Sequence, residues 1–428
     1  MRNFERFISH PVFGEGKIVD TRLLGQQLKV EFKDGFTLWL SSEGLRIFEK
    51  TEETIDEIVA RRMIEAFRIG IVPHQDVERF TFGREREIKM IERAIKNLEA
   101  GSGGVYLIEG EYGSGKSHLL EYIRHWATKA ELATTYCELD PREVSPHRPK
   151  RVYRELVHNL RYIDNGTEVT FRDILRKAVT LDLADHQFFT PVLKKLNRFD
   201  RDSAMSEVFW QWIEGESTKE YATLYKGPYR LPGAQKIPAL YDFSTASDFY
   251  CYIISGLSYI LRNLKMKGLV LLVDEAESVT HLWNLIAVDR GLSFLEGLIR
   301  TAQNEQILKE VDQRLIHNRV RTTPYIYKDS YILLFIATTP IVGEYSYAKM
   351  VNLIGERLVL NPLREANLVE LFESLCFIYY KAYKDFDLKA EWKQRLLNSA
   401  LRKKDIGIRF FIKYWVEGLD CLRWKGKV

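Results

Sequence analysis

The sequence predicts an α/β fold, in which a mainly parallel sheet is covered by helices, with a small β-rich module before it and a helical region after it. The first observation is a pair of continuous apolar runs, at residues 268–273 and 331–337. Strands buried on both faces have such runs, because neither face carries alternating polar residues. The second observation is a glycine-rich loop between an apolar strand, residues 105–108, and a helix, residues 117–129. This order of strand, loop and helix is typical of parallel α/β sheets.

The length of 428 residues predicts two or three compact units, at roughly 150 residues each. We expect a small β-barrel module at residues 1–50, an α/β core at 51–345 with a helical insertion at about 141–245, and a helical region at 346–428. The chain has 63 Lys and Arg against 59 Asp and Glu, a net charge of +4. This weak excess excludes a protein that coats a polyanion over its whole surface, so any polyanion contact has to be local.

The four cysteines are far apart and form no CxxC pair, which excludes a disulfide framework and a zinc knuckle. The first residues contain no apolar core of a signal peptide. The apolar stretch at residues 249–261 is too short for a membrane span, which needs about 20 residues. We therefore expect a cytoplasmic protein that makes no contact with a membrane.

Short β-type runs at residues 8–46 predict a small, strongly bent β-barrel. Asp34 and Gly35 stand between two alternating runs and indicate a hairpin, because a tight turn matched to the strand twist needs positive φ. The segment from His10 to Gly16, with the pattern HPxFGxG, resembles the start of Tudor- or SH3-like modules attached to some helicases and transcription factors. Such modules bind protein or nucleic acid. A packing module without a ligand is the alternative.

Residues 110–117 match the phosphate-binding loop pattern GxxxxGK[ST] in full. Its glycines let the backbone bend, so that successive N–H groups and the helix N-terminus point at phosphates. In this pattern Lys116 reaches the β- and γ-phosphates and Ser117 ligates Mg²⁺. We therefore expect ATP and Mg²⁺ as cofactors. The predicted nucleotide-binding residues are Gly110, Glu111, Tyr112, Gly113, Ser114, Gly115, Lys116, Ser117 and His118.

The apolar run at 268–273 ends in Asp274 and Glu275, the pattern of a Walker B strand whose carboxyl end faces the ligand crevice. Asp274 is the predicted second metal residue, holding Mg²⁺ through its water shell. Glu275 is expected to orient the water that attacks the γ-phosphate, or to accept its proton. We expect Glu277 to be a solvated residue at the start of a helix.

The second apolar run ends in Thr338 and Thr339. It is similar to the sensor 1 strand of AAA+ ATPases, which lies between the P-loop and Walker B strands and offers a polar side chain to the γ-phosphate and the attacking water. The resemblance implies a P-loop AAA+ three-layer core with a helical lid. It assigns the sensor role to Thr339, or else to Thr338. A threonine that caps the following turn is the alternative.

Two arginines acquire roles from the same resemblance, particularly to the origin-recognition and Cdc6 branch. There, an arginine just before the next strand is often the finger inserted into a neighbour's ATP, which makes Arg357 the candidate. A surface ion pair is the alternative for Arg357. Arg409 follows Gly407 and resembles the sensor 2 arginine, which reaches from the lid to the phosphates. The glycine is one residue nearer than in the usual G-x-x-R, so a structural arginine at a helix start is the alternative.

Five strings of the sequence carry a further resemblance, residues 62–73, 82–85, 110–118, 274–278 and 409–420. In these strings, and from about residue 60 onward, the chain resembles the ATP-binding proteins of bacterial BREX-type phage-defence systems, the BrxC/BrxD-like group. The resemblance implies a cytoplasmic ATPase in a multi-protein anti-phage complex that works on DNA. Only the ATP site is carried over residue by residue.

The predicted insertion contains a basic stretch with two neighbouring tyrosines, Tyr153 and Tyr162. Basic residues beside aromatic ones suit DNA or an acidic partner, whereas a solvated helix face is the alternative. The predicted DNA contact is either this stretch or the N-terminal barrel. The basic residues are Arg142, Arg148, Lys150, Arg151, Arg154 and Arg161.

These observations favour an AAA+ ATPase that drives assembly or remodelling of a phage-defence or DNA-transaction complex, with other defence proteins as partners and a nucleotide-dependent homo-oligomer as its assembly. A nucleotide-gated switch that does not hydrolyse ATP is one alternative. A helicase-associated motor is another, because residues 274–277 superficially resemble a DEAD-type box. Against the motor, no second motor lobe and no QxxGRxxR string follow in the sequence.

Overall fold

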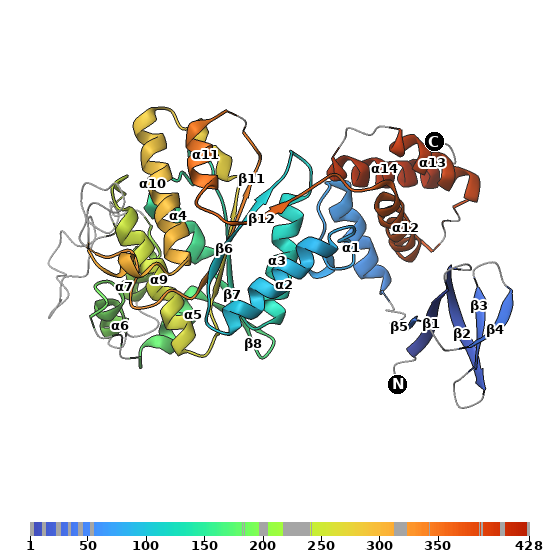
Figure 1. Ribbon diagram of the computed structural model, residues 1–428, viewed down its shortest axis with the longest axis horizontal. Helices are drawn as coiled ribbons and strands as arrows, with labels where there is room; N and C mark the ends of the chain where they lie inside the picture. The colour runs from blue at the N-terminus through green and yellow to red at the C-terminus, as the bar shows by residue number, and fades with distance from the viewer. Residues whose placement is uncertain are drawn as a thin grey trace. The chain divides into compact units, whose positions relative to one another are not determined.

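The computed structural model describes most of the chain, and its elements are labelled in Figure 1. Contacts divide the chain into two compact units, Met1–Arg62 with Ile378–Asp385, and Met63–Phe377 with Phe386–Val428. The described residues are 4–10, 14–22, 27–32, 36–41, 46–51, 55–181, 183, 185–196, 204–216, 240, 242–311, 323–341, 343–384, 386, 388–402 and 407–425.

The first unit contains a five-stranded antiparallel sheet with the order β4-β3-β2-β1-β5. Its apolar centre includes Ile8, Val30 and Phe32, all almost fully buried. Gly16 is needed in this sheet, since a Cβ there would lie only 2.9 Å from the Phe32 ring and nearer still to Val30. The strands are β1 (Phe4–His10), β2 (Gly14–Arg22), β3 (Gln27–Phe32), β4 (Thr37–Ser41) and β5 (Arg46–Thr51).

The antiparallel module predicted for the N-terminus is thus present, and the last glycine of the HPxFGxG pattern, Gly16, pairs with Ile8 of β1 and with Phe32 of β3. The predicted Asp34-Gly35 turn lies outside the described residues, although the strands on either side of it, β3 and β4, pair antiparallel. The pairings among the described residues leave β4 and β5 as the two edges of the sheet. Closure into a barrel therefore stays a prediction.

The second unit is built on a seven-stranded sheet with the order β12-β6-β11-β10-β7-β8-β9 (Figure 1). The first five strands in this order are parallel, and the last two form an antiparallel hairpin at the edge. As predicted, the second apolar run, now β11, lies between the P-loop strand β6 and the Walker B strand β10. The strands are β6 (Gly104–Glu109), β7 (Ala133–Glu138), β8 (Arg161–Asp164), β9 (Thr167–Thr170), β10 (Leu269–Asp274), β11 (Ile332–Thr338) and β12 (Glu356–Val359).

Alternate residues of the central strands face two separate apolar layers. Val270 and Leu272 of β10 pack on one side with helices α2 and α3, whereas Leu269 and Leu271 pack on the other with α4, α5, α6, α7, α9, α10 and α11. The sheet is therefore the middle of three layers, as predicted. The helices are α2 (Glu85–Glu99), α3 (Lys116–Lys129), α4 (Pro149–His158), α5 (Phe171–Ala178), α6 (Phe189–Leu196), α7 (Ala204–Ile213), α9 (Ser247–Asn263), α10 (Leu285–Ala302) and α11 (Tyr345–Val351).

The segment predicted as a helical insertion is only partly helical. It contributes helices α4 to α7, but it also holds the β8–β9 hairpin, which extends the main sheet beyond β7. The turn of this hairpin is Asn165-Gly166, and both residues have positive φ, 51° and 81°. Asn-Gly between two β-type runs is a strong hairpin signal, because such a turn requires positive φ at both positions. The sequence therefore contained a local signal for this hairpin.

The C-terminal region is helical, as predicted. Trp415 of α14 is fully buried, and its ring centroid lies 5.1 Å from that of Phe372 on α12. Helix α1 joins this region through its last turn, because the Arg68 guanidinium donates two hydrogen bonds of 2.9 Å to the Asp420 carboxylate on α14. Among the described residues, no helix is long and apolar enough to cross a membrane. The helices are α1 (Glu57–Arg68), α12 (Glu365–Ala382), α13 (Ala390–Leu401) and α14 (Ile408–Lys425), and the short 3₁₀ turns are η1 (His74–Asp76), η2 (Ala276–His281) and η3 (Gln306–Lys309).

Candidate nucleotide-binding site

The glycine-rich loop joins β6 to α3, as its sequence pattern predicts. Gly113 and Gly115 have φ of 78° and 99°, a conformation that a residue with a side chain rarely adopts. A Cβ at Gly110 would lie close to the Ser114 hydroxyl, so this position also has no room for a larger residue. Glycine is therefore required for its backbone conformation at Gly113 and Gly115 and for its small size at Gly110.

Lys116 starts α3 and is buried. Its ammonium donates hydrogen bonds to the carbonyl oxygen of Gly110, at 3.0 Å, and to Oγ1 of Thr339, at 2.8 Å. Of the two threonines considered for the sensor 1 position, Thr339 therefore contacts the P-loop lysine directly. Thr338 is fully buried, and its hydroxyl is 3.4 Å from the carbonyl oxygen of Thr339.

Asp274 lies at the end of β10 and is held by three donors. Its Oδ2 accepts hydrogen bonds from the Ser117 hydroxyl, at 2.8 Å, and from the Tyr136 hydroxyl, at 3.3 Å. Its Oδ1 accepts from the backbone N–H of Glu275, at 2.9 Å. The two residues predicted for Mg²⁺ are thus in direct contact, and their oxygen atoms are the donor type that Mg²⁺ prefers.

Tyr136 was not predicted as a site residue. It lies on β7 and reaches Asp274 because β7 and β10 are neighbouring parallel strands. Burial, followed by the nearby Asp274 carboxylate, raises the pKa of the phenol. The hydroxyl therefore stays protonated and acts as a donor to Asp274. No local motif marks this residue, since the contact depends on strand order.

Glu275 has a left-handed backbone conformation, with φ 55° and ψ 40°, and caps η2. Its side chain lines the pocket beside the P-loop. Burial raises its pKa, and the neighbouring Glu277 and Asp274 raise it further, while Lys116 acts in the opposite direction. A raised pKa brings a carboxylate nearer to the range in which a general base works at neutral pH.

The expectation that Glu277 is solvated is wrong. Only 7% of the residue is exposed, and its Oε2 has no hydrogen-bond partner among the described residues. Burial and the Glu109 carboxylate raise the pKa of the Tyr347 phenol on α11, and Glu277, which lies in η2, adds to this shift. The packing of α11 against η2 removes this carboxylate from water, which sequence periodicity over a six-residue turn does not reveal.

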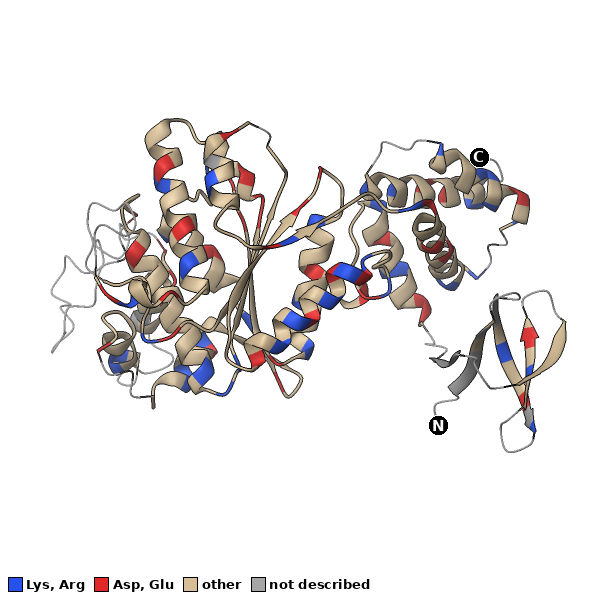
Figure 2. Cartoon of the chain, in the orientation of Figure 1, with Lys and Arg blue, Asp and Glu red and all other residues tan. Residues whose placement is uncertain are grey.

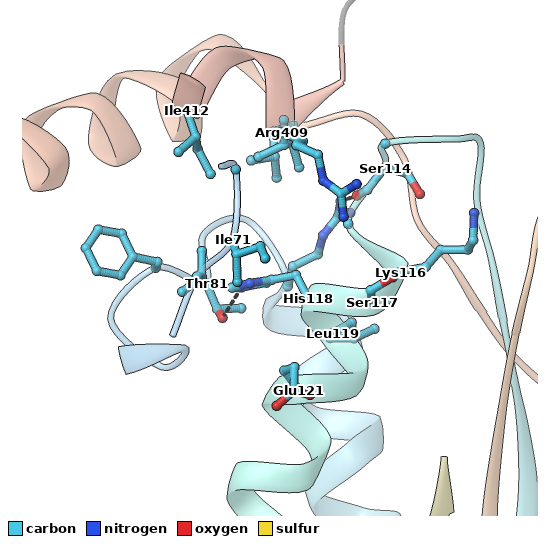
Figure 3. A pocket seen from close by; sticks show the side chains of 18 of the residues that line it. Ile71, Thr81, Ser114, Lys116, Ser117, His118, Leu119, Glu121, Arg409 and Ile412 are labelled. Atoms are coloured by element: carbon cyan, nitrogen blue, oxygen red, sulfur yellow. Dashed lines mark hydrogen bonds between the residues drawn. The ribbon is translucent and has the colours of Figure 1, made fainter. Parts of the chain in front are cut away.

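A pocket of about 290 Å³ lies over the P-loop (Figure 3). Its apolar lining includes Ile71 and Val72 from the segment after α1, and Leu371 and Ile412 from the lid. Seven of the nine residues predicted to bind nucleotide line this pocket, whereas Gly110 and the exposed Glu111 do not. The seven are Tyr112, Gly113, Ser114, Gly115, Lys116, Ser117 and His118.

His118 lies on the pocket wall next to Thr81, at 2.8 Å between Nε2 and Oγ1 (Figure 3). The Thr81 hydroxyl donates to the carbonyl oxygen of Val77, so it accepts from His118. Burial, helped by the Arg84 charge, lowers the pKa of His118 to about 4. His118 is therefore a neutral imidazole with its proton on Nε2.

ATP and Mg²⁺ fit the residues that are present. The Ser114 hydroxyl is buried without a partner among the described residues, as expected for a group that donates a hydrogen bond to a phosphate oxygen of the nucleotide. Lys116 and Ser117 stand at the N-terminus of α3, where the helix dipole favours an anion. Asp274 and Ser117 supply the oxygen donors for the metal.

Arg409 lines the same pocket from α14. The start of this helix rests on the P-loop, because the N–H of Ile408 donates a 3.2 Å hydrogen bond to the Gly113 carbonyl oxygen. Arg409 also covers Gly70, where φ is +74° and a Cβ would be 2.5 Å from the arginine Cγ. The lid placement expected for Arg409 agrees with this geometry. A contact between its guanidinium and a phosphate stays a prediction.

Arg357 lies within β12, at the edge of the sheet, rather than before the strand. Its guanidinium is 3.9 Å from the Glu109 carboxylate and 3.4 Å from the Val351 carbonyl oxygen. About 40% of the side chain is exposed, and the residue does not line the pocket of its own chain. Its role as a finger for a neighbouring subunit stays a prediction.

Most of the predicted basic stretch is engaged within the chain. Arg151 pairs with Asp242 at 3.4 Å, and Arg161 pairs with Glu168 at 2.6 Å. Lys150 is buried and donates to the Glu216 carbonyl oxygen at 2.9 Å. Outside this stretch, acidic and basic residues are mixed along helices such as α2 and α10 (Figure 2). The structure therefore gives no continuous free basic surface over the described part of this stretch.

The fold and the site together define an α/β protein with a P-loop between β6 and α3, and with a C-terminal helical region that contacts this loop. Residues 55–187 match the model of the family described as BREX system ATP-binding protein BrxC/D. The match confirms, over residues 55–187, the resemblance to the BrxC/BrxD-like group that the sequence predicts. No curated protein matches the chain.

Two solved structures are similar to the chain in parts of their fold. The Orc1 protein of Aeropyrum pernix in complex with DNA is 12% identical, with a TM-score of 0.37, and the alignment covers 81% of this chain and 63% of the Orc1 chain. A chain of the HORMA:CdnC:Trip13 complex of E. coli MS115-1 is 9% identical, with a TM-score of 0.32, and coverages of 81% and 91%.

Proposed function

We propose that this protein hydrolyses ATP in a Mg²⁺-dependent reaction and uses it to drive assembly or remodelling of a bacterial phage-defence or DNA-transaction complex. The observation that carries the proposal is the convergence of Lys116, Thr339, Asp274 and Glu275 at the carboxyl end of three neighbouring strands. These are the groups that phosphoryl transfer to water needs, a cation, a hydroxyl, a metal residue and a base.

Each residue has a distinct part in the proposed reaction. Lys116 neutralises charge on the β- and γ-phosphates, and Thr339, already 2.8 Å from the lysine, orients the terminal phosphate and the water. Glu275 takes a proton from that water, which its raised pKa favours. Ser117 and Asp274 would hold Mg²⁺, which would reduce the charge on the phosphates when bound. Tyr136 keeps Asp274 in place through its hydrogen bond.

ATP-dependent formation of a homo-oligomer follows if a second copy of the chain supplies Arg357 to the ATP site. The exposed position of Arg357 on the edge strand supports this part of the proposal. Its contact with Glu109 in the same chain opposes it, because the guanidinium would have to leave that carboxylate. DNA as a partner, other defence proteins as partners, and a cytoplasmic location belong to the same proposal and rest on the family resemblance.

The deciding experiment measures phosphate release by the wild type and by Glu275→Gln, together with the mass of both proteins with and without ATP. Glu111→Gln is the matched control, since Glu111 belongs to the same loop but is exposed outside the pocket. We expect release by the wild type and the control, and a loss of about 10²-fold or more in Glu275→Gln. Equal inactivity of all three, with and without DNA, would instead establish a nucleotide-gated switch.

A further inference from the structure

Arg84 makes a bridge that no sequence motif predicted. It is the N-cap residue of α2 and only 7% exposed. Its Nη1 donates a 2.8 Å hydrogen bond to the carbonyl oxygen of Asn361, and its Nη2 donates a 2.9 Å hydrogen bond to that of Ser114. Ser114 belongs to the P-loop, and Asn361 belongs to the segment between β12 and α12. One planar guanidinium therefore spans the P-loop and the linker that leads into the lid.

The surroundings of Arg84 leave it little freedom. The preceding Gly83 has φ +63°, and a Cβ there would be 2.6 Å from the side-chain oxygen of Asn367, on the first turn of α12. The chain before α2 is therefore pressed against the lid helix on one side. On the other side, the guanidinium meets the P-loop. A bulkier residue at position 83 would push the two elements apart.

The P-loop has a second attachment to the lid. The carbonyl oxygen next to that of Ser114 belongs to Gly113, and it accepts the N–H of Ile408 at the start of α14. Gly407 packs directly on Gly113, where a Cβ would come within 2.9 Å of backbone atoms. Two successive carbonyl groups of the P-loop are thus held, one by the lid helix α14 and one by Arg84, which also holds the linker to α12.

The charge of Arg84 is not neutralised by a close ion pair among the described residues. Burial lowers its pKa, while Glu87 and Glu85 act at longer range in the opposite direction. A buried guanidinium is costly unless its donors are satisfied, and the two carbonyl oxygens meet part of that need. Lysine has a single ammonium without this fork, so it would not bridge both carbonyl groups in the same way.

We propose that Arg84 is a positioning residue that couples the shape of the P-loop to the position of the lid. When the loop changes to accept phosphates, the Ser114 carbonyl moves, and the rigid guanidinium transmits that movement to Asn361 and the linker. The lid in turn fixes Gly113 through Ile408. The link to nucleotide rests on the ATP-binding function proposed above, whereas the mechanical link between loop and lid does not.

The mechanical link is tested without nucleotide, by amide hydrogen exchange of Arg84→Lys and Arg84→Met. Arg86→Met is the matched control, because Arg86 is exposed on the same helix. We expect exchange to accelerate roughly tenfold in three segments together, residues 110–116, 361–368 and 407–411, since a bond to a charged donor is lost at the loop and at the linker. Acceleration confined to residues next to position 84, or equal acceleration in the control, would overturn the proposal.

The functional consequence is tested with a fluorescent ATP analogue on the same proteins, with unfolding temperatures as a check of folding. For Arg84→Lys we expect the affinity to fall roughly tenfold while the nucleotide-free unfolding temperature stays near that of the wild type. In the wild type, the analogue should slow exchange in all three segments. A lower unfolding temperature with unchanged affinity would show that Arg84 only stabilises the fold and would overturn the coupling. Absence of binding by the wild type would refute the ATP-binding function, and the exchange result alone would then decide the mechanical link.

Discussion

The Ser117 hydroxyl donates a 2.8 Å hydrogen bond to Oδ2 of Asp274, although 157 residues separate them in the chain. Ser117 comes from the first turn of α3 and Asp274 from the end of β10, two strands away from the P-loop strand. The contact places the two oxygen donors predicted for Mg²⁺ side by side. The packing of α3 against β10 therefore positions both donors at one point of the site.

Replacing Ser117 tests the predicted metal site. We expect Ser117→Ala to lose roughly tenfold of the Mg²⁺-dependent part of ATP affinity, because one oxygen donor is removed while Asp274 keeps Tyr136 and the Glu275 N–H. The measurement is titration of a fluorescent ATP analogue with Mg²⁺ and with EDTA. Affinity in EDTA should barely change, since Lys116 remains. An equal loss in both conditions would show that Ser117 acts on the loop rather than on the metal.

Thr339 contacts the ammonium of Lys116, and removing its hydroxyl should affect hydrolysis more than binding. We expect Thr339→Val to lower single-turnover phosphate release by about 10- to 100-fold while ATP affinity changes by less than about threefold, because the lysine keeps its charge and its bond to Gly110. Thr338→Val is the matched control, since the Thr338 hydroxyl contacts the Thr339 carbonyl oxygen and the Tyr347 phenol rather than Lys116. If the control loses as much activity as Thr339→Val, the sensor assignment is wrong.

The sequence predicted the parts of this site that depend on neighbouring residues in the chain. The loop, the two acids at the end of β10 and the apolar strands are local patterns, and the structure has them where the sequence predicts them. The prediction of a helical insertion does not include the β8–β9 hairpin, although Asn165-Gly166 marks its turn. Tyr136 and Arg84 had no comparable signal. Their contacts join strands or segments that are distant in sequence, so only the assembled sheet brings them to the site.

The burial of Glu277 also has no signal in the neighbouring sequence. A carboxylate three residues after a strand is usually solvated, and nothing near it in the sequence says otherwise. Its burial follows from α11, which arrives from residues 345–351 and packs on η2. The consequence is chemical as well as structural, because the buried charge acts on the candidate base Glu275.

The raised pKa of Glu275 predicts how hydrolysis depends on pH. A base works only when deprotonated, so phosphate release should rise with pH through a midpoint above the ordinary glutamate value of 4.5. Glu277→Gln removes one cause of the shift and should move that midpoint to lower pH. The measurement is single-turnover release between about pH 5 and 8. A midpoint that stays in place in Glu277→Gln would contradict the coupling of these two carboxylates.

The same shift predicts the effect of Glu275 on stability. Between 4.5 and its raised pKa, the folded protein holds the Glu275 proton more strongly than the unfolded chain does. The free energy of unfolding contributed by this group therefore falls as pH rises through that window. Glu275→Gln should unfold at the same temperature as the wild type or slightly higher at pH 7, and the difference should shrink at pH 4.5. Thermal unfolding at both pH values checks this, and a less stable variant at pH 7 would contradict it.

The contacts of the basic stretch predict that it is not the main site of any DNA binding. Arg151 and Arg161 already have carboxylate partners. Each guanidinium also donates a hydrogen bond to a backbone carbonyl oxygen of the same chain. We expect Arg151→Glu with Arg154→Glu to change salt-dependent DNA affinity by less than about threefold. Fluorescence anisotropy of labelled duplex DNA over a range of salt measures this. A loss of more than tenfold with a smaller salt slope would show that these arginines do contact phosphates.

Arg357 allows a direct test of assembly, because its carboxylate partner within the same chain is Glu109. If it serves as a finger, the guanidinium leaves Glu109 to enter the site of a second copy, so Arg357→Ala should hydrolyse ATP at least about 10²-fold more slowly while binding it normally. Glu109→Gln releases the arginine and should not lower hydrolysis. Mixing Arg357→Ala with Glu275→Gln should restore part of the activity, since each copy supplies what the other lacks. Full activity of Arg357→Ala at every protein concentration would mean that Arg357 only pairs with Glu109 at the edge of the sheet.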